Sequence, residues 1–193
     1  MSYATYTTKA IVCGSNVSNT ADKSFLLFTE EAGMLWATAK SVREERSRQR
    51  HALQDFSKIR VSLLKGKSGW RIGSVEARGN PFMEAKNRAD RTKCAHIIKL
   101  LRRYVHGEAT LTPVFLDVEE LLQNTLSPEL ETTLLLDVFE LRLLSTLGYV
   151  EKNNNIKNIL EAPTVMEAAR MCNKEDLVLI SRLTEQASKA SHL

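Results

Sequence analysis

Residues 40–50 contain the side chains whose types and spacing most directly predict a chemical role. Five cations fall within this short segment: Lys40, Arg43, Arg46, Arg48 and Arg50. Ammonium and guanidinium groups gathered in this way bind the phosphates of a polyanion by charge, independently of its sequence. A second interpretation is a solvated charged loop, in which Glu44 and Glu45 neutralise part of the set within a local helix. Charge alone leaves both interpretations open.

The charge of the chain divides near Gly107. Residues 1–107 contain 20 lysine and arginine residues against 9 aspartate and glutamate residues, whereas residues 108–193 contain 7 against 14. The net charge of +4 therefore conceals a basic part and an acidic part. We expect the acidic part to avoid nucleic acid, and either to face a basic protein or simply to keep the domain in solution.

Residue types that serve catalysis or bind metals are scattered along the chain. The four histidines show no metal-ligand spacing such as H-x-x-x-H, and Cys13, Cys94 and Cys172 are far apart, with no C-x-x-C pair. An odd number of distant cysteines also argues against a disulfide framework. Residues 66–69 lack the spacing of a phosphate-binding loop and indicate a hairpin turn. We therefore predict no catalytic residue, no metal, no cofactor and no small-molecule substrate, so that the protein is not an enzyme.

The length and composition of the chain bound its class. With 193 residues, of which 43% are hydrophobic, the chain is long enough for one large domain or two small ones. No run approaches the roughly 20 apolar residues that a membrane helix needs. Residues 1–9 lack the basic region and apolar core of a signal peptide. We expect an intracellular protein without a membrane partner.

The basic segment lies between runs that are typical of strands. Residues 57–65 alternate apolar and polar side chains, which is the pattern of a half-buried strand. Four other short apolar runs predict strands: 5–13, 24–28, 34–39 and 70–75. A turn is expected at Gly14 after the first run, and Gly33 suits a positive φ in the turn after the second. Five short antiparallel strands predict a closed barrel, and the OB-fold is the common five-stranded form.

Helical spacing replaces the strand pattern after residue 80. The expected helices are 83–104, 113–124, 127–147, 165–171 and 174–187. Ser127 and Pro128 are predicted as the N-cap and the first residue of the third helix. Thr164 and Glu167 form a predicted capping box, and Asn173 is the expected cap of the last helix.

These patterns predict the fold class β + α. The N-terminal five-stranded OB-fold barrel is expected at residues 1–79, and an all-α C-terminal domain at residues 80–193. In OB-folds the nucleic-acid site combines cations with aromatic rings that stack on bases. Trp36 and Trp70 are the candidates for stacking. Two weaker candidates are Phe28 and Phe56, of which we assign Phe28 to the barrel core.

Separate blocks of residues resemble the RecO family of bacterial DNA repair proteins. Residues 8–12 and 25–40 look like the N-terminal domain of that family, and residues 47–56 resemble the basic segment that follows it. Residues 139–149, Phe-Glu-Leu-Arg-Leu-Leu-Ser-Thr-Leu-Gly-Tyr, are similar to the family's F-E-x-R-L-L-x-x-L-G-Y helix end. The blocks occur in the family's order and at about its separation, so the resemblance extends over most of the chain.

The resemblance implies an OB-fold followed by a helical domain. It also implies binding of single- and double-stranded DNA, annealing of complementary strands, and loading of recombinase onto strands coated by single-strand binding protein. The implied partners are RecR and single-strand binding protein, and the implied location is the bacterial cytoplasm, in association with the nucleoid.

Two positions depart from the family pattern. Many members carry a four-cysteine zinc module after the L-G-Y segment, whereas here no cysteine follows Tyr149 until Cys172, so no zinc site is expected. Ser41 stands where the family usually has glycine. This substitution affects the expected geometry of the loop after Lys40, although it leaves the charge of the loop unchanged.

We therefore predict a DNA-binding recombination mediator. The predicted DNA-binding residues come from the barrel and from the basic face of helix 83–104: Lys40, Arg43, Arg46, Arg48, Arg50, Lys58, Arg60, Arg88, Arg91, Lys99, Arg102 and Arg103. Lys93 is also placed on that basic face. The alternatives are a protein-binding adaptor whose helical domain engages repair partners, and an RNA-binding OB-fold protein, which would prefer RNA to DNA.

Overall fold

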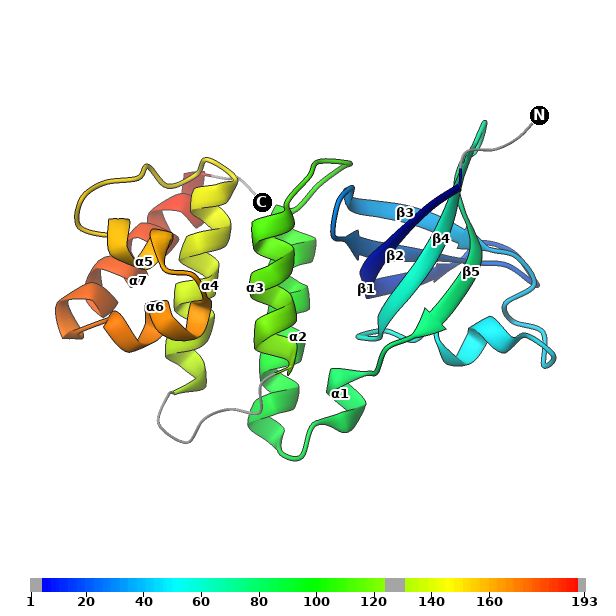
Figure 1. Ribbon diagram of the computed structural model, residues 1–193, viewed down its shortest axis with the longest axis horizontal. Helices are drawn as coiled ribbons and strands as arrows, with labels where there is room; N and C mark the ends of the chain where they lie inside the picture. Colours follow the sequence, from blue (N-terminus) through cyan, green and yellow to red (C-terminus); the bar gives the residue numbers. More distant parts are fainter. Residues whose placement is uncertain (1–4, 124–130, 191–193) are drawn as a thin grey trace. The chain divides into compact units, whose positions relative to one another are not determined.

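The computed structural model describes residues 5–123 and 131–190 (Figure 1). None of the helices in these ranges is both long enough and apolar enough to cross a membrane. Two compact units divide the chain. Residues up to Lys86 form one unit together with residues 105–112, and residues 87–104 form the other with those from Pro113 onward. A short segment that follows a helix therefore packs with the strands, while the predicted functional division at residue 79 stays a prediction.

Five strands close a barrel in the first unit. They are β1 (Thr5–Val17), β2 (Lys23–Thr29), β3 (Gly33–Ala39), β4 (Lys58–Gly66) and β5 (Gly69–Ala77). Their order around the barrel is β1-β2-β3-β5-β4, and β4 pairs again with β1 (Figure 1). This closed five-stranded arrangement confirms the predicted OB-fold barrel. The hairpin turn predicted between Gly66 and Gly69 is confirmed as well.

One pairing in the barrel is parallel, so the prediction of five antiparallel strands is wrong. β3 pairs with β5 in parallel, with Ala37 opposite Trp70 and Thr38 opposite Arg71. The other four pairings are antiparallel. The physical reason is the odd number of strands, because directions cannot alternate all the way around a closed ring of five.

β1 is longer than the sequence indicates. It runs to Val17, and its pairing with β2 shifts register between Val12 and Gly14. Such a bulge bends a strand, and here the first half of β1 pairs with β4 while the second half pairs with β2. The predicted turn at Gly14 is therefore wrong, since this glycine lies at an irregularity within a continuous strand.

Inward-facing side chains of all five strands fill the barrel. Phe25, Leu27 and Leu63 are among the fully buried ones. Val42 and Leu53, which lie in the connection between β3 and β4, are buried in the same core. This connection is therefore anchored at two points, and the polar residues between the anchors remain at the surface.

Seven α-helices lie within the described residues. They are α1 (Pro81–Glu84), α2 (Arg88–Tyr104), α3 (Thr112–Gln123), α4 (Thr132–Thr146), α5 (Lys157–Glu161), α6 (Val165–Met171) and α7 (Lys174–Ala190). An OB-fold barrel followed by helices confirms the predicted fold class. The single helix expected over 83–104 is wrong, because α1 ends in extended backbone at Ala85 and the Asn87 side chain then accepts a hydrogen bond from the Asp90 amide at the start of α2.

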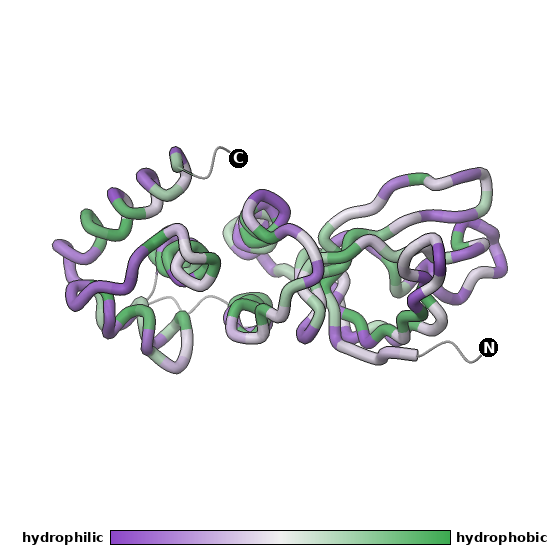
Figure 2. The backbone as a smooth tube through the Cα atoms, turned by 90° about the horizontal axis from the view of Figure 1, so that it is seen from above, coloured by the Kyte–Doolittle hydropathy of each residue, from purple (hydrophilic) through white to green (hydrophobic). Residues whose placement is uncertain are grey.

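The predicted helix caps are confirmed where the structure describes them. Thr164 Oγ1 accepts a hydrogen bond from the Glu167 amide at 3.1 Å. Asn173 Oδ1 accepts from the amides of Glu175 and Asp176 at 2.8 and 3.0 Å. In Figure 2 the tube of α7, which leads to the C label, alternates between hydrophilic and hydrophobic colours, as expected of an amphipathic helix.

Three features of the helical part differ from the prediction or fall outside it. Helix α5 was not predicted, because it is short and follows a polar connector. The helix expected over 127–147 is wrong at its start, because α4 begins at Thr132 and its N-cap Glu131 has an extended backbone. The predicted cap at Ser127 and Pro128 lies outside the described residues.

Candidate nucleic-acid interface

The connection between β3 and β4 carries its basic side chains into solvent. We call residues 40–50 the basic loop, and all of its cations are exposed: Lys40, Arg43, Arg46, Arg48 and Arg50. Its last residues form part of a short 3-10 helix, η1 (Arg48–His51), in which no residue is buried. Within residues 5–123 and 131–190, the side chains of Arg46, Arg48 and Arg50 form neither an ion pair nor a hydrogen bond.

The acids of the basic loop do not neutralise its arginines. Glu44 and Glu45 are exposed, and in the described part of the chain neither of them forms an ion pair with Arg46 or Arg48. The alternative interpretation of an internally neutralised helix therefore has no support in this geometry. The charge of the loop stays available to a ligand.

The start of the basic loop is tied to the connection between β1 and β2. The Ser41 amide donates to Asp22 Oδ1 at 2.8 Å, and the Arg43 amide donates to the Ala21 carbonyl at 3.1 Å. The Arg43 guanidinium donates to the Asn19 carbonyl at 3.0 Å. The bond from the Ser41 amide is the main cause that lowers the pKa of Asp22, and the positive charge of Lys40 adds to it.

Ser41 has a left-handed backbone, with φ of 51°. Glycine adopts this conformation without steric cost, which gives a physical reason for the glycine that the resembling family usually has here. Ser41 adopts this strained conformation, and its amide donates a hydrogen bond to Asp22. The loop geometry is thus compatible with the substitution.

The end of the connection is held by packing and by side-chain hydrogen bonds. The Asn80 amide group donates to the Asp55 carbonyl at 3.0 Å, and Ser15 Oγ donates to Asp55 Oδ1 at 3.2 Å. The ring of Phe56 stacks on that of Phe82 with centroids 4.5 Å apart. Phe56 therefore has a structural partner, which weakens its case as a base-stacking residue.

A hollow of about 600 Å³ lies between the two connections. We call it the loop hollow, and its lining combines three cations, one carboxylate, one amide and four apolar side chains: Lys23, Arg43, Arg50, Asp55, Gln54, Val17, Phe25, Val42 and Leu53. Lys23 Nζ lies 5.3 Å from the centroid of the Phe25 ring. Two of the predicted DNA-binding residues, Arg43 and Arg50, thus face one recess.

An aromatic ring and a cation lie on the outer face of the neighbouring strands. Alternate residues of a strand lie on one face, so Trp36 and Thr38 share the outside of β3, and the exposed Lys40 follows directly after the strand. Arg71 of β5 is exposed beside Thr38. The Trp36 side chain is 46% exposed, which leaves its ring accessible for stacking.

Trp70 is used inside the barrel unit. Its ring packs against the barrel core, and its indole N–H donates to Glu108 Oε1 at 2.8 Å. Lys65 Nζ lies 4.9 Å from the ring centroid and 3.0 Å from Glu108 Oε2. The bond from Trp70, followed by that from Lys65, lowers the pKa of Glu108. Of the two tryptophans, Trp36 therefore has the more accessible ring. Phe28 is fully buried, which confirms its assignment to the barrel core.

The remaining barrel candidates lie on β4. Lys58 is half-buried at the start of the strand, whereas Arg60 is exposed. Arg60 lies between Lys9 of β1 and Glu76 of β5 in the register of the sheet. A positive and a negative neighbour therefore flank it, and its local charge is less one-sided than that of the basic loop.

Four of the six basic residues of α2 form an exposed stripe, and Arg103 and Lys93 do not belong to it. Arg88, Arg91, Lys99 and Arg102 are exposed and recur at helical spacing, which places them on one face. Arg103 is half-buried and donates to Ser188 Oγ at 2.8 Å. These residues belong to the helical unit, so the structure groups them separately from the basic loop.

Lys93 does not belong to the basic stripe of α2, contrary to the prediction. Its side chain is buried, with Nζ 3.7 Å from Asp90 Oδ1. Burial lowers the pKa of Lys93, and the charge of Asp90 opposes this effect. Lys93 precedes Cys94, and both residues lie on the buried side of α2. The prediction assigned Lys93 to the exposed face because its side chain is charged.

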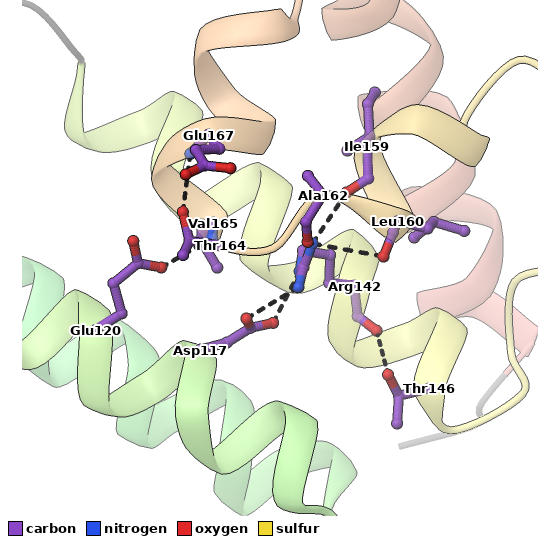
Figure 3. Close-up of polar contacts among 10 residues, drawn as sticks. All are labelled: Asp117, Glu120, Arg142, Thr146, Ile159, Leu160, Ala162, Thr164, Val165 and Glu167. Atoms are coloured by element: carbon purple, nitrogen blue, oxygen red, sulfur yellow. Dashed lines mark hydrogen bonds and ion pairs between the residues drawn. The ribbon is translucent and has the colours of Figure 1, made fainter.

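Arg142 forms several hydrogen bonds within the helical unit, and this role was not predicted from the sequence. Arg142 of α4 donates to both carboxylate oxygens of Asp117, at 2.8 and 3.0 Å, and to the Ala162 carbonyl at 2.8 Å (Figure 3). It also donates to the Ile159 carbonyl at 3.1 Å. We call this group the Arg142 cluster. Because Arg142 lies within the segment that resembles F-E-x-R-L-L, that motif position has a structural role here.

The Asp117 carboxylate of the Arg142 cluster is buried. Desolvation raises its pKa, while the hydrogen bonds and charge of Arg142 oppose that rise. A second link joins α3 to α6, since the Val165 amide donates to Glu120 Oε2 at 2.8 Å (Figure 3). These contacts connect α3 with α4 and with the segments around α5 and α6. Within the described ranges, no three histidine, cysteine, aspartate or glutamate side chains gather in a geometry that would hold a metal ion.

Comparisons with known proteins agree with this architecture. Residues 1–79 match the family model described as "Recombination protein O N terminal". The DNA repair protein RecO of Caldanaerobacter subterraneus subsp. tengcongensis is 25% identical over 169 residues, which are 88% of this chain and 63% of that protein. The protein of the same name from Coxiella burnetii is 31% identical over 125 residues, covering 64% of this chain and 52% of the relative.

A third relative, DNA repair protein RecO of Acetivibrio thermocellus, is 27% identical over 146 residues, with 74% of this chain and 57% of the relative covered. The chain thus spans between 52% and 63% of the length of these three relatives.

Proposed function

Because this chain belongs to the RecO family of DNA repair and recombination proteins, we propose that it is a DNA-binding recombination mediator without enzymatic activity. It binds single- and double-stranded DNA, anneals complementary strands and helps to load recombinase. Its partners are DNA, RecR and single-strand binding protein, and it acts in the bacterial cytoplasm at the nucleoid.

The basic loop carries this proposal. A protein cation contributes most to binding when it is not already satisfied internally, because each phosphate that it neutralises releases a counterion. Arg46, Arg48 and Arg50 are exposed and unpaired within the described residues. The backbone on either side is fixed, because the Ser41 amide donates to Asp22 and the Asn80 side chain donates to the Asp55 carbonyl. Charge is thus presented on a prearranged frame.

The outer face of β3 extends this surface. The exposed ring of Trp36 offers a platform for a base, Arg71 lies beside Thr38 on the same face, and Lys40 directly follows the strand. Base–aromatic stacking combined with cations is the usual means by which OB-folds hold single strands. The stripe of Arg88, Arg91, Lys99 and Arg102 on α2 supplies a second basic surface for a second strand or a duplex. Annealing follows because two strands with neutralised phosphates approach each other without strong repulsion.

The proposal is tested by reversing the charge of the basic loop. We expect Arg46→Glu/Arg48→Glu/Arg50→Glu to lower the affinity for a fluorescent single-stranded oligonucleotide by about a hundredfold or more at roughly 0.1 M salt, since three phosphate contacts become repulsive. Fluorescence anisotropy gives the dissociation constants.

A matched control separates the position of the charges from their number. Lys152→Glu/Lys157→Glu/Lys174→Glu makes the same change in net charge at exposed residues of the helical unit. We expect this variant to bind nearly as well as the unmodified chain. Equal losses in the two triple variants, or no loss in the first, would contradict the proposal.

A protein-binding adaptor remains a second candidate because of one observation. Met171 and Val178 of the helical unit are 57% and 72% exposed, which leaves apolar surface available to a partner. An adaptor would bind single-strand binding protein through that protein's acidic tail and would not need the basic loop. The triple charge reversal of the basic loop distinguishes the two, since an adaptor would keep its binding to single-strand binding protein in that variant, whereas a DNA-binding mediator would lose strand annealing. A pull-down with single-strand binding protein, with and without its acidic tail, measures the first of these activities. RNA and DNA competitors of one sequence test the RNA-binding alternative.

A further inference from the structure

The loop hollow combines features that a phosphate-binding surface alone does not need. Part of its lining is apolar: Val17 is exposed, and Phe25, Val42 and Leu53 belong to the buried barrel core beneath it. Its volume of about 600 Å³ falls within the range of small-molecule sites. A purely electrostatic contact with a backbone requires no such recess. A recess of this size with a partly apolar lining fits a flat ring system.

The cations around the loop hollow come from both of its walls. Lys23 begins β2, whereas Arg43 and Arg50 belong to the basic loop. One guanidinium nitrogen of Arg43 donates to the Asn19 carbonyl, and the guanidinium has further N–H donors. Three cations against the single carboxylate of Asp55 make the recess net positive, which suits an occupant that carries a phosphate.

The polar groups of the loop hollow suit the edge of a nucleobase. Gln54 offers both a donor and an acceptor, and Asp55 offers carboxylate oxygens. Asp55 is positioned by its bonds to Ser15 and Asn80, so its orientation is set before a ligand arrives. A carboxylate repels phosphate but accepts hydrogen bonds from the amino and imino groups of bases.

We propose that the loop hollow binds one unstacked nucleotide of single-stranded DNA, with its base against Val17, the exposed apolar side chain of the lining, and its phosphate on Lys23, Arg43 and Arg50. This inference rests on the proposed DNA binding and adds a specific subsite to it. Bases within a duplex are stacked and paired, so only a single strand can deliver a base to the recess. The loop hollow thereby gives the chain a preference for single strands that its other charges do not provide.

The first test needs no variant. Binding of the full chain is measured for a short single-stranded oligonucleotide and for a strand of equal length in which abasic sites replace the bases. We expect about tenfold tighter binding of the strand with bases, because base contacts of this kind are worth about one decade or more in affinity. Equal affinities would overturn the inference, whereas the proposed DNA binding would still stand; no binding to either strand would overturn the proposed function itself.

The second test fills the hollow. Val17 lines it and is 63% exposed, so Val17→Trp inserts a ring into the recess without disturbing the barrel core. The matched control is Asn16→Trp, since neighbouring residues of a strand point to opposite faces and Asn16 is exposed. We expect Val17→Trp to reduce the preference for the strand with bases about threefold or more, relative to the abasic strand, while Asn16→Trp retains it. The remaining preference would then come from Trp36.

The salt dependence separates this effect from a loss of charge. Val17→Trp should leave the dependence of the abasic-strand affinity on salt unchanged, because it removes no cation of the basic loop. An unchanged preference in Val17→Trp, or the same reduction in Asn16→Trp, would overturn the inference. Circular dichroism of both variants verifies that the barrel is folded.

Discussion

The basic loop of the barrel and the Arg142 cluster of the helical unit use the same residue type in opposite ways. Arg142 is almost completely enclosed, and its donors are taken up by Asp117 and by backbone carbonyls. Arg46, Arg48 and Arg50 lie in solvent with no such partners among the described residues. The difference shows that a cation serves stability when the fold satisfies it, and remains available for binding when the fold supports only the backbone beneath it.

The largest expected effect tests the structural side of this comparison. Arg142→Met leaves the buried Asp117 carboxylate and several carbonyl oxygens unpaired, so we expect the free energy of unfolding to fall by about 3–5 kcal/mol. Arg46→Met should change it by less than about 0.5 kcal/mol, because the side chain is exposed. Urea unfolding followed by circular dichroism measures both.

The double variant Arg142→Met/Asp117→Leu serves as the control for this loss. Removing both charges eliminates the unpaired carboxylate, so part of the stability should return. If Arg142→Met were as stable as Arg46→Met, the assignment of Arg142 as a structural residue would be wrong.

The two tryptophans repeat the comparison within the barrel unit. Trp70→Ala removes a ring that packs on the core and a hydrogen bond to Glu108, so we expect the free energy of unfolding to fall by about 2–3 kcal/mol. Trp36→Ala should leave stability nearly unchanged and weaken single-strand binding about tenfold, because the ring is exposed. Thermal unfolding and fluorescence anisotropy measure the two effects, and the opposite assignment of losses would refute the distinction.

Lowering the pH should weaken the hydrogen bonds that Trp70 and Lys65 donate to Glu108. The folded-state pKa of Glu108 is lowered by the Trp70 bond and then by Lys65, so the stability from this group is present above its ordinary pKa and is lost as the pH falls through the folded-state pKa. In a Trp36→Phe background, we expect the fluorescence of Trp70 to change over that acidic range. Glu108→Gln should abolish the transition; a transition that persists in this variant would show that another group causes it.

The smallest expected effect concerns the strained residue at the start of the basic loop. Ser41→Gly relieves a left-handed backbone but increases the entropy of the unfolded chain, so we expect a net stabilisation of about 0.5 kcal/mol. Ser47→Gly is the matched control, because Ser47 has φ of −72° and should be slightly destabilised. Equal shifts in melting temperature for both variants would contradict the strain at Ser41.

The sequence predicted those parts of the molecule that local patterns determine. Alternation along residues 57–65 identified a barrel strand, and the side chains of Thr164 and Asn173 identified helix starts, because in each case the signal lies within a few residues. The exposure of the basic loop followed from its polarity between two strands. The parallel contact of β3 with β5 depends on closure of the whole barrel and has no local signal.

Long-range contacts account for what the sequence did not show. Glu108 meets Trp70 from a segment that follows α2, and Arg142 meets Asp117 and Ala162 from two other segments. A charged residue that pairs across the fold looks like a surface residue in the sequence. The motif around Arg142 could have indicated this contact, because a largely buried arginine within a mostly apolar helix requires a hydrogen-bonding partner.

The dependence of single-strand affinity on salt tests the central claim most directly. Dissociation constants are measured from low to moderate salt for the unmodified chain and for Arg46→Gln/Arg48→Gln/Arg50→Gln, which removes charge without reversing it. Three lost phosphate contacts should reduce the slope of log affinity against log salt by about 2. An unchanged slope would contradict the account, because the cations of the basic loop would then make no contact with DNA phosphates.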